Sequence, residues 1–241
     1  MKKLILAGVV VLLGGVAFAM SDVYVSGIWR YKMTVTVETP EGLKTGYAVR
    51  EVSNSASDIK IIDLPESGNP AKVRGEAVAV DLGERGVLFA LISDAFIFHR
   101  AFRGDVSGST TVRGIKFFND IPIGTKVTLN EKFYPKLVTF TDIDDPKSVG
   151  LVRGSRFDIE TQKSFPVNDF EKLFGVGVQL KKITIERVKE PVTWQVSNYL
   201  KWLPDYYNKR LDGNRFGTIR AKDRLANSLS SGAFSTGSNK K

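Results

Sequence analysis

The sequence of 241 residues contains no cysteine and only one histidine, His99. Without cysteine the chain forms no disulfide, offers no thiol nucleophile and cannot carry the lipid of a bacterial lipoprotein. A zinc site is not expected either, because zinc in proteins is held by several Cys and His ligands. The fold must therefore be stabilised by its hydrophobic core alone.

His99 is the one residue through which a histidine-based acid–base mechanism would have to run. It lies within the aromatic run of residues 96–102, and the sequence has no Gly-x-Ser-x-Gly motif to accompany it. These surroundings favour packing over catalysis. We therefore predict a structural role for His99 and no catalytic residue.

Long apolar runs are also absent, except at the N-terminus. Lys2 and Lys3 precede an apolar and glycine-rich stretch over residues 4–20, and the sequence Ala17-Phe18-Ala19 has small residues at the positions read by a signal peptidase. This order is typical of a secretory signal, which predicts a signal peptide over residues 1–19. A stretch of this length also lies at the lower limit for a membrane span, so an uncleaved anchor to about residue 20 is the alternative.

Either alternative predicts an exported protein. The rest of the chain would be periplasmic, soluble after cleavage or tethered to the inner membrane by its N-terminal segment. The formal net charge is +9, and it is +7 once Lys2 and Lys3 are removed. Such a charge can favour an anionic partner, but the basic residues are scattered among acids, as on an ordinary soluble surface.

Alternating apolar residues predict strands along most of the remaining chain. Residues 30–38 and 43–51 flank the turn sequence Pro40-Glu41-Gly42 and predict an antiparallel hairpin. Residues 76–82 and 87–92 predict a second hairpin, whose nearly continuous apolar character indicates cover on both faces. Residues 137–141 predict another strand.

Residues 176–188 predict a strand whose apolar residues change parity in the middle. Val176, Val178 and Leu180 share one parity, and Ile183 and Ile185 the other. A β-bulge at Lys181-Lys182 would turn all five inward.

Helical patterns are short and few. They cover residues 170–174 behind Asn168 or Asp169, residues 196–203 before Pro204, and residues 221–229. Residues 95–102 fit either a buried strand or a short helix. The stretch 230–241 is rich in Ser, Gly and Asn, and we expect it to be disordered.

Together these patterns predict a mainly β fold: an antiparallel sheet sandwich or barrel-like single domain over residues 24–229, with two or three short helices. The acidic sequence Asp142-Ile143-Asp144-Asp145-Pro146 fits a turn better than a calcium loop, because it lacks the glycine and the distal glutamate of such a loop. We therefore expect no metal and no cofactor.

An aromatic and basic stretch extends over residues 194–216. Its possible surface-contact residues are Trp202, Tyr206, Tyr207, Lys201, Lys209 and Arg210. Aromatic rings beside basic residues suit a membrane interface, whereas the alternative is a lid over one end of the sheet. We favour the lid.

Scattered blocks of the sequence resemble a family of uncharacterised proteobacterial proteins with an N-terminal signal or membrane segment. The blocks include residues 31–35, 38–42, 73–78, 137–140 and 183–186. The resemblance implies export and one compact unit, and it implies no activity and no site residue.

The lack of cysteine, the single histidine and the absence of a catalytic motif favour a non-enzymatic, envelope-associated binding or structural module. Its expected partner is an envelope protein or an anionic membrane surface, and no nucleic acid is expected. The alternative is a periplasmic hydrolase with paired carboxylates, for which Glu76, Asp81, Glu84 and Asp94 are the first candidates.

Overall fold

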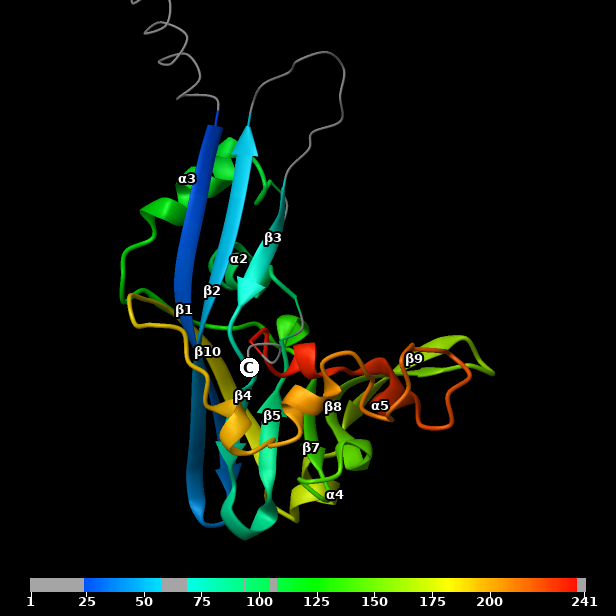
Figure 1. The fold of residues 1–241 in the computed structure, drawn as a ribbon. Coiled ribbons are helices and arrows are strands. Elements are labelled where there is room, and N and C mark those ends of the chain that lie inside the picture. The colour runs from blue at the N-terminus through cyan, green and yellow to red at the C-terminus, as the bar shows by residue number, and fades with distance from the viewer. Residues whose placement is uncertain (1–23, 58–68, 93, 105–107, 238–241) are drawn as a thin grey trace, which may run out of the picture.

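The computed structural model describes residues 24–57, 69–92, 94–104 and 108–237. They form two antiparallel sheets of five strands each, and neither sheet closes into a barrel within these residues (Figure 1). The predicted mainly β class is confirmed. No helix of the described residues is long and apolar enough to span a membrane, and the predicted signal or anchor segment lies outside them.

The first sheet has the order β3-β2-β1-β10-β6. Its strands are β1 (Tyr24–Thr39), β2 (Gly42–Ser57), β3 (Asn69–Arg74), β6 (Lys126–Thr128) and β10 (Gln179–Val188). β1 and β2 pair along their whole length, which confirms the first predicted hairpin. Alternate β1 residues, among them Met33 and Val35, are fully buried, as their period of two predicts.

The predicted bulge in β10 is also present. Thr36 pairs with Lys182 and the next residue, Val37, pairs with Leu180, so that Lys181 is left over. Val176 is 81% exposed, so its predicted inward position is wrong. Val176 precedes the strand and lies in a loop between Gly175 and Gly177, which both have positive φ. The strand alternation therefore does not apply to this residue.

The second sheet has the order β4-β5-β7-β8-β9. Its strands are β4 (Val78–Asp81), β5 (Val87–Ala90), β7 (Leu137–Phe140), β8 (Val149–Asp158) and β9 (Lys163–Asn168). The pairing of β4 with β5 confirms the second hairpin. Leu88 and Ala90 pack in a core shared with the first sheet, whereas Phe89 packs in a second core, so β5 is covered on both faces as predicted.

Four short α-helices lie in the described residues: α2 (Ile97–Arg103), α3 (Val112–Asp120), α4 (Phe170–Phe174) and α5 (Arg224–Ser228). α4 and α5 were predicted, and α2 resolves the choice left open for residues 95–102. Residues 196–203 form no α-helix. Instead, 3-10 turns cover Val196–Asn198 and Leu203–Tyr206. Pro204 lies within the first two residues of the second turn, where its fixed φ suits a helix start.

The C-terminal residues 230–237 are folded, so the predicted disorder is wrong for them; residues 238–241 lie outside the described residues. Phe234 is fully buried, and its ring lies within 6 Å of those of Phe89, Phe140 and Trp202. Its carbonyl accepts a hydrogen bond of 2.7 Å from the Ala77 amide. One large apolar side chain holds an otherwise polar segment in the second core.

Candidate functional site

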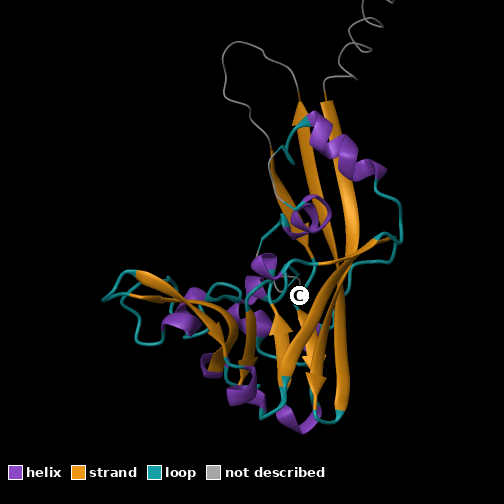
Figure 2. Cartoon of the chain, turned by 180° about the vertical axis from the view of Figure 1, so that it is seen from behind, coloured by secondary structure: helices purple, strands orange, loops and turns teal. Residues whose placement is uncertain are grey.

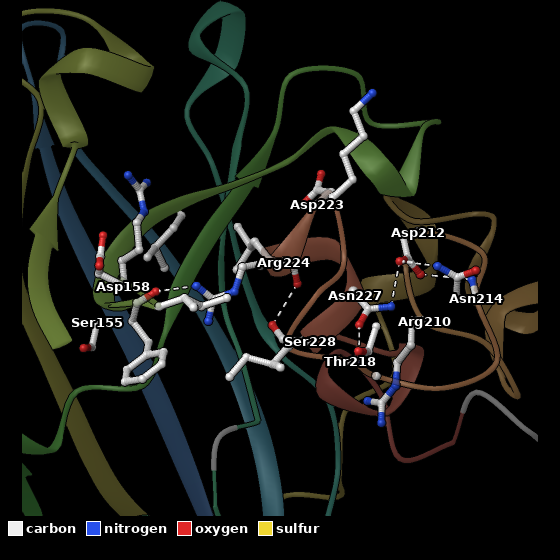
Figure 3. A pocket seen from close by; sticks show the side chains of 18 of the residues that line it. Ser155, Asp158, Arg210, Asp212, Asn214, Thr218, Asp223, Arg224, Asn227 and Ser228 are labelled. Carbon is white, nitrogen blue, oxygen red and sulfur yellow. Dashed lines mark hydrogen bonds between the residues drawn. The ribbon is translucent and has the colours of Figure 1, made fainter. Parts of the chain in front are cut away.

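An open pocket of about 1300 Å³ lies between the β8–β9 hairpin and the C-terminal segment that contains α5 (Figure 3). The outer part of this hairpin extends away from the rest of the sheet (Figures 1 and 2). The C-terminal segment, residues 210–228, forms the opposite wall. The pocket therefore brings together parts of the chain that are far apart in sequence.

Arg224 joins the two walls. Its Nη1 donates a hydrogen bond of 2.7 Å to the carbonyl of Phe157 in β8, and its guanidinium lies 5.5 Å from the centre of the Phe157 ring. Arg224 is the first residue of α5, whose N-cap residue Asp223 accepts a hydrogen bond from the Ala226 amide. The helix thus fixes the position of the hairpin relative to the second core.

The opposite wall is held by a hydrogen-bond network around Asn227, which is buried. Asn227 Nδ2 donates to Asp212 Oδ2 at 2.7 Å, and Asn227 Oδ1 accepts from the Thr218 amide at 2.6 Å. Asn214 Nδ2 donates to the same Asp212 oxygen at 2.7 Å (Figure 3). The loop between Asp212 and Thr218 is therefore fixed by side chains rather than by sheet pairing.

The acidic side chains of the pocket are mostly engaged in such local bonds. Asp158 accepts from both the amide and the hydroxyl of Thr161, and these bonds lower the pKa of its carboxyl group. Burial opposes ionisation of Asp212, but the hydrogen bonds from Asn214 and Asn227 prevail, and the pKa of this carboxyl group is lowered. Both groups are therefore anionic at neutral pH.

The cationic side chains are less engaged. The lining holds six of them: Lys136, Lys147, Arg156, Arg210, Lys222 and Arg224. Among the described residues, Lys136, Arg156 and Lys222 form no salt bridge. Lys136 is half-buried, and desolvation lowers the pKa of its ammonium group. Burial removes water from around this ammonium group. An anion bound in the pocket would stabilise its charged form.

The predicted surface-contact residues fall into three groups. Trp202 is buried in the second core, where its Nε1 donates to the Ile143 carbonyl at 2.9 Å, and Tyr206 packs on its ring. This packing is that of a lid. Tyr207, Lys201 and Lys209 are exposed, and a membrane contact through them stays a prediction. Arg210 is half-buried and lines the pocket.

The carboxylates proposed for a hydrolase do not converge. Glu76 is buried and accepts from the Val196 amide at 2.6 Å, Asp81 accepts from the Gly83 amide, and Asp94 pairs with Arg100. None of the three lines the pocket, and neither does Glu84. Each of the first three has its own local partner, which is the arrangement of a structural residue.

The acidic sequence from Asp142 to Pro146 forms a turn. Asp142 accepts from the Asp144 amide, and Asp145 caps a 3-10 turn (Pro146–Ser148) by accepting from the Lys147 amide. No cluster of three or more His, Asp or Glu side chains suited to a metal ion occurs in the part of the chain that the structure describes.

His99 is fully buried among the rings of Trp29, Phe96, Phe98 and Phe118. Neither of its ring nitrogens has a hydrogen-bond partner among the described residues. Desolvation lowers the pKa of the imidazole from 6.5 to about 4, so that it is neutral at physiological pH. Its surroundings agree with the predicted packing role.

The chain matches no protein-family model, no curated protein sequence and no solved structure in the comparisons made with each. The resemblance to proteobacterial exported proteins gains no support from them. The features that bear on function are therefore the pocket and its charges.

Proposed function

We propose that this protein is an exported, non-enzymatic binding module of the cell envelope, and that its pocket accepts an anionic group of another envelope component. The observation that carries the proposal is that the acidic side chains of the pocket have local partners, whereas several of the basic ones form no salt bridge in the described residues. Asp158, Asp212 and Asp223 are held by local hydrogen bonds, whereas Lys136 and Arg156 form no salt bridge among the described residues. A phosphate or carboxylate would provide the missing counter-charge.

The protonation state of the pocket acids favours binding over hydrolysis. A hydrolase with paired carboxylates needs one carboxyl group whose raised pKa lets it donate a proton. The pKa values of Asp158 and Asp212 are lowered. Among the described lining residues, these two acids support a charged recognition surface rather than an acid catalyst.

The envelope location rests on the order of Lys2, Lys3, the apolar residues 4–20 and the Ala-Phe-Ala sequence. We propose a periplasmic domain, either released or tethered to the inner membrane. The N-terminal residue of the protein, determined by mass spectrometry of cell fractions, tests this directly. A start at Met20 indicates release, an intact segment 1–20 indicates the anchor, and recovery from the cytoplasm alone contradicts both.

Titration calorimetry of the full chain in a neutral detergent tests the pocket, with inorganic phosphate and citrate as probes. We expect binding that weakens as the salt concentration rises. The double variant Lys136→Gln and Arg156→Gln should bind at least about tenfold more weakly, because each substitution removes a hydrogen bond to a charged group. Lys163→Gln is the matched control, since Lys163 lies on the same hairpin but does not line the pocket.

The proposal is contradicted if neither probe binds, or if the double variant binds as tightly as the Lys163→Gln control. Unchanged thermal unfolding of the double variant would show that a loss of binding does not come from misfolding. Neither Arg156, which is exposed, nor Lys136 forms a salt bridge in the described residues, so both substitutions leave the ion pairs of these residues intact.

A further inference from the structure

The outward face of α3 carries exposed basic and aromatic side chains. α3 lies beside the first residues of β1, at the end of the molecule where the described chain begins (Figures 1 and 2). Its inner face buries Val112, Ile115 and Phe118 in the first core. The residues between them, Arg113, Lys116 and Phe117, are exposed.

These side chains form one patch together with Arg103 at the end of α2. The Arg103 guanidinium lies 6.0 Å from the centre of the Phe117 ring, which is 45% exposed. We name Arg103, Arg113, Lys116 and Phe117 the α3 patch. None of its three cations forms a salt bridge among the described residues, and Asp120 is the one acid of α3.

The position of α3 relative to the first described residues of β1 is fixed by Asn119. Asn119 Nδ2 donates to the Ser26 carbonyl at 3.3 Å, and Asn119 Oδ1 accepts from Trp29 Nε1 at 2.9 Å. Ser26 follows the last residue of the apolar run, Met20, by six residues, which span at most about 20 Å. If the run lies in a bilayer, α3 is therefore held within about 20 Å of that bilayer along the chain.

We infer that the α3 patch docks on the anionic phospholipid headgroups of the membrane that receives residues 4–20. Three cations that form no salt bridge within the described part of the chain suit lipid phosphates, and an exposed aromatic ring beside them suits the apolar side of the headgroup layer. Tyr24, which is 57% exposed, adds a second aromatic side chain at the same end of β1. The inference rests on the tethered alternative of the proposed function and does not depend on the pocket.

The lack of cysteine allows a test with single labels in the full chain. Asp120→Cys reports on the exposed end of α3, and Leu43→Cys reports on the β1–β2 turn at the opposite end of β1. Each fluorescent label is followed in vesicles of phosphatidylcholine alone and of phosphatidylcholine with phosphatidylglycerol, both with a quencher on the lipid headgroup. The charge-reversed variant is Arg103→Glu, Arg113→Glu and Lys116→Glu, and its matched control is Lys163→Glu, Lys182→Glu and Lys189→Glu, three exposed lysines outside the patch and outside the predicted contact residues.

We expect the label at residue 120 to be quenched in the anionic vesicles and the label at residue 43 to remain unquenched. Each basic residue near an anionic surface contributes a factor of about five, so loss of the three cations alone should weaken docking about a hundredfold, and their reversal should weaken it further. We expect the charge-reversed variant to show no quenching, while the matched control keeps it. If the charge-reversed variant fails to fold, Arg113→Gln with Lys116→Gln should give a partial loss.

Two results would overturn the inference. Quenching that is equal in both lipids and in the charge-reversed variant means that the tether alone brings α3 near the membrane. An unquenched label at residue 120 means that the patch does not reach the headgroups. The phosphate titration of the charge-reversed variant should equal that of the wild type, so failure of the pocket proposal and failure of the α3 patch are distinguishable.

Discussion

Arg50 and Glu76 are two buried residues of opposite charge that are joined through the backbone. Arg50 Nε donates to the Glu76 carbonyl oxygen at 2.7 Å, and Arg50 Nη2 donates to the Ala90 carbonyl oxygen at 3.0 Å. The Glu76 carboxylate instead accepts from the Val196 amide. One side chain of β2 thus connects the first sheet to the segment that precedes β4 and to the last residue of β5.

Substitution of Arg50 by methionine should therefore be costly. It would leave two buried carbonyls without this donor, and we expect the free energy of unfolding to fall by about 3 kcal/mol. Urea denaturation measures the change. Arg30→Met is the control, because Arg30 is largely exposed and its ion pair with Glu51 is worth at most about 1 kcal/mol. Equal losses in the two variants would contradict the connecting role of Arg50.

His99 should make the stability depend on pH. The pKa of its imidazole is about 4 in the folded protein and 6.5 when unfolded, so only the unfolded state binds a proton between these values. The contribution of neutral His99 to the free energy of unfolding is complete above pH 6.5 and is lost as the pH falls to about 4. The loss is at most about 3 kcal/mol. Asp94, the nearest acid that acts on the imidazole, opposes this shift.

The variant His99→Leu isolates this effect from that of the carboxyl groups, which also titrate at low pH. Relative to the wild type, the variant should gain stability steadily as the pH falls from 6.5 to 4, as measured by urea denaturation at several pH values. If the difference in stability between the two proteins does not change with pH, the pKa of His99 is the same in the folded and unfolded states, which contradicts the prediction.

Gly46 should tolerate no side chain, although it lies in a regular strand. A Cβ atom at this position would lie 1.9 Å from the Ala79 carbonyl oxygen, where β2 and β4 cross. Gly46→Ala should lower the free energy of unfolding by at least about 1–3 kcal/mol, because backbone has to move. Gly150→Ala is the control: its nearest neighbours would lie 3.8 Å away, and its thermal unfolding should change little.

The parts of the fold that were predicted are those with local signals. Alternation predicted both hairpins, and the parity change at Lys181-Lys182 predicted the bulge, because each pattern is set by neighbours along the chain. α3 was not predicted. Thr111 caps it and its apolar residues recur every three positions, but Gly114 and the polar residues between them weaken the pattern.

The pocket could not be predicted from the sequence. Lys136, Arg156 and Asn227 carry no motif, and they meet because Arg224 holds the β8–β9 hairpin against α5. Arg210 was the one lining residue named in advance, and it was assigned to a surface contact. The order of residues 230–237 was missed for a related reason: Phe234 is a single apolar residue whose buried site is built by distant strands.

The placement of β5 between the two cores has a consequence for how the molecule opens. Leu88 and Phe89 are neighbours on one backbone, yet they anchor different clusters. If one cluster loosens, the amides of this strand stay protected from water, because the other cluster still holds the strand in place. The exchange of β5 amide hydrogens with solvent should therefore need the loss of both clusters at once, which makes these four residues a reporter of global rather than local unfolding.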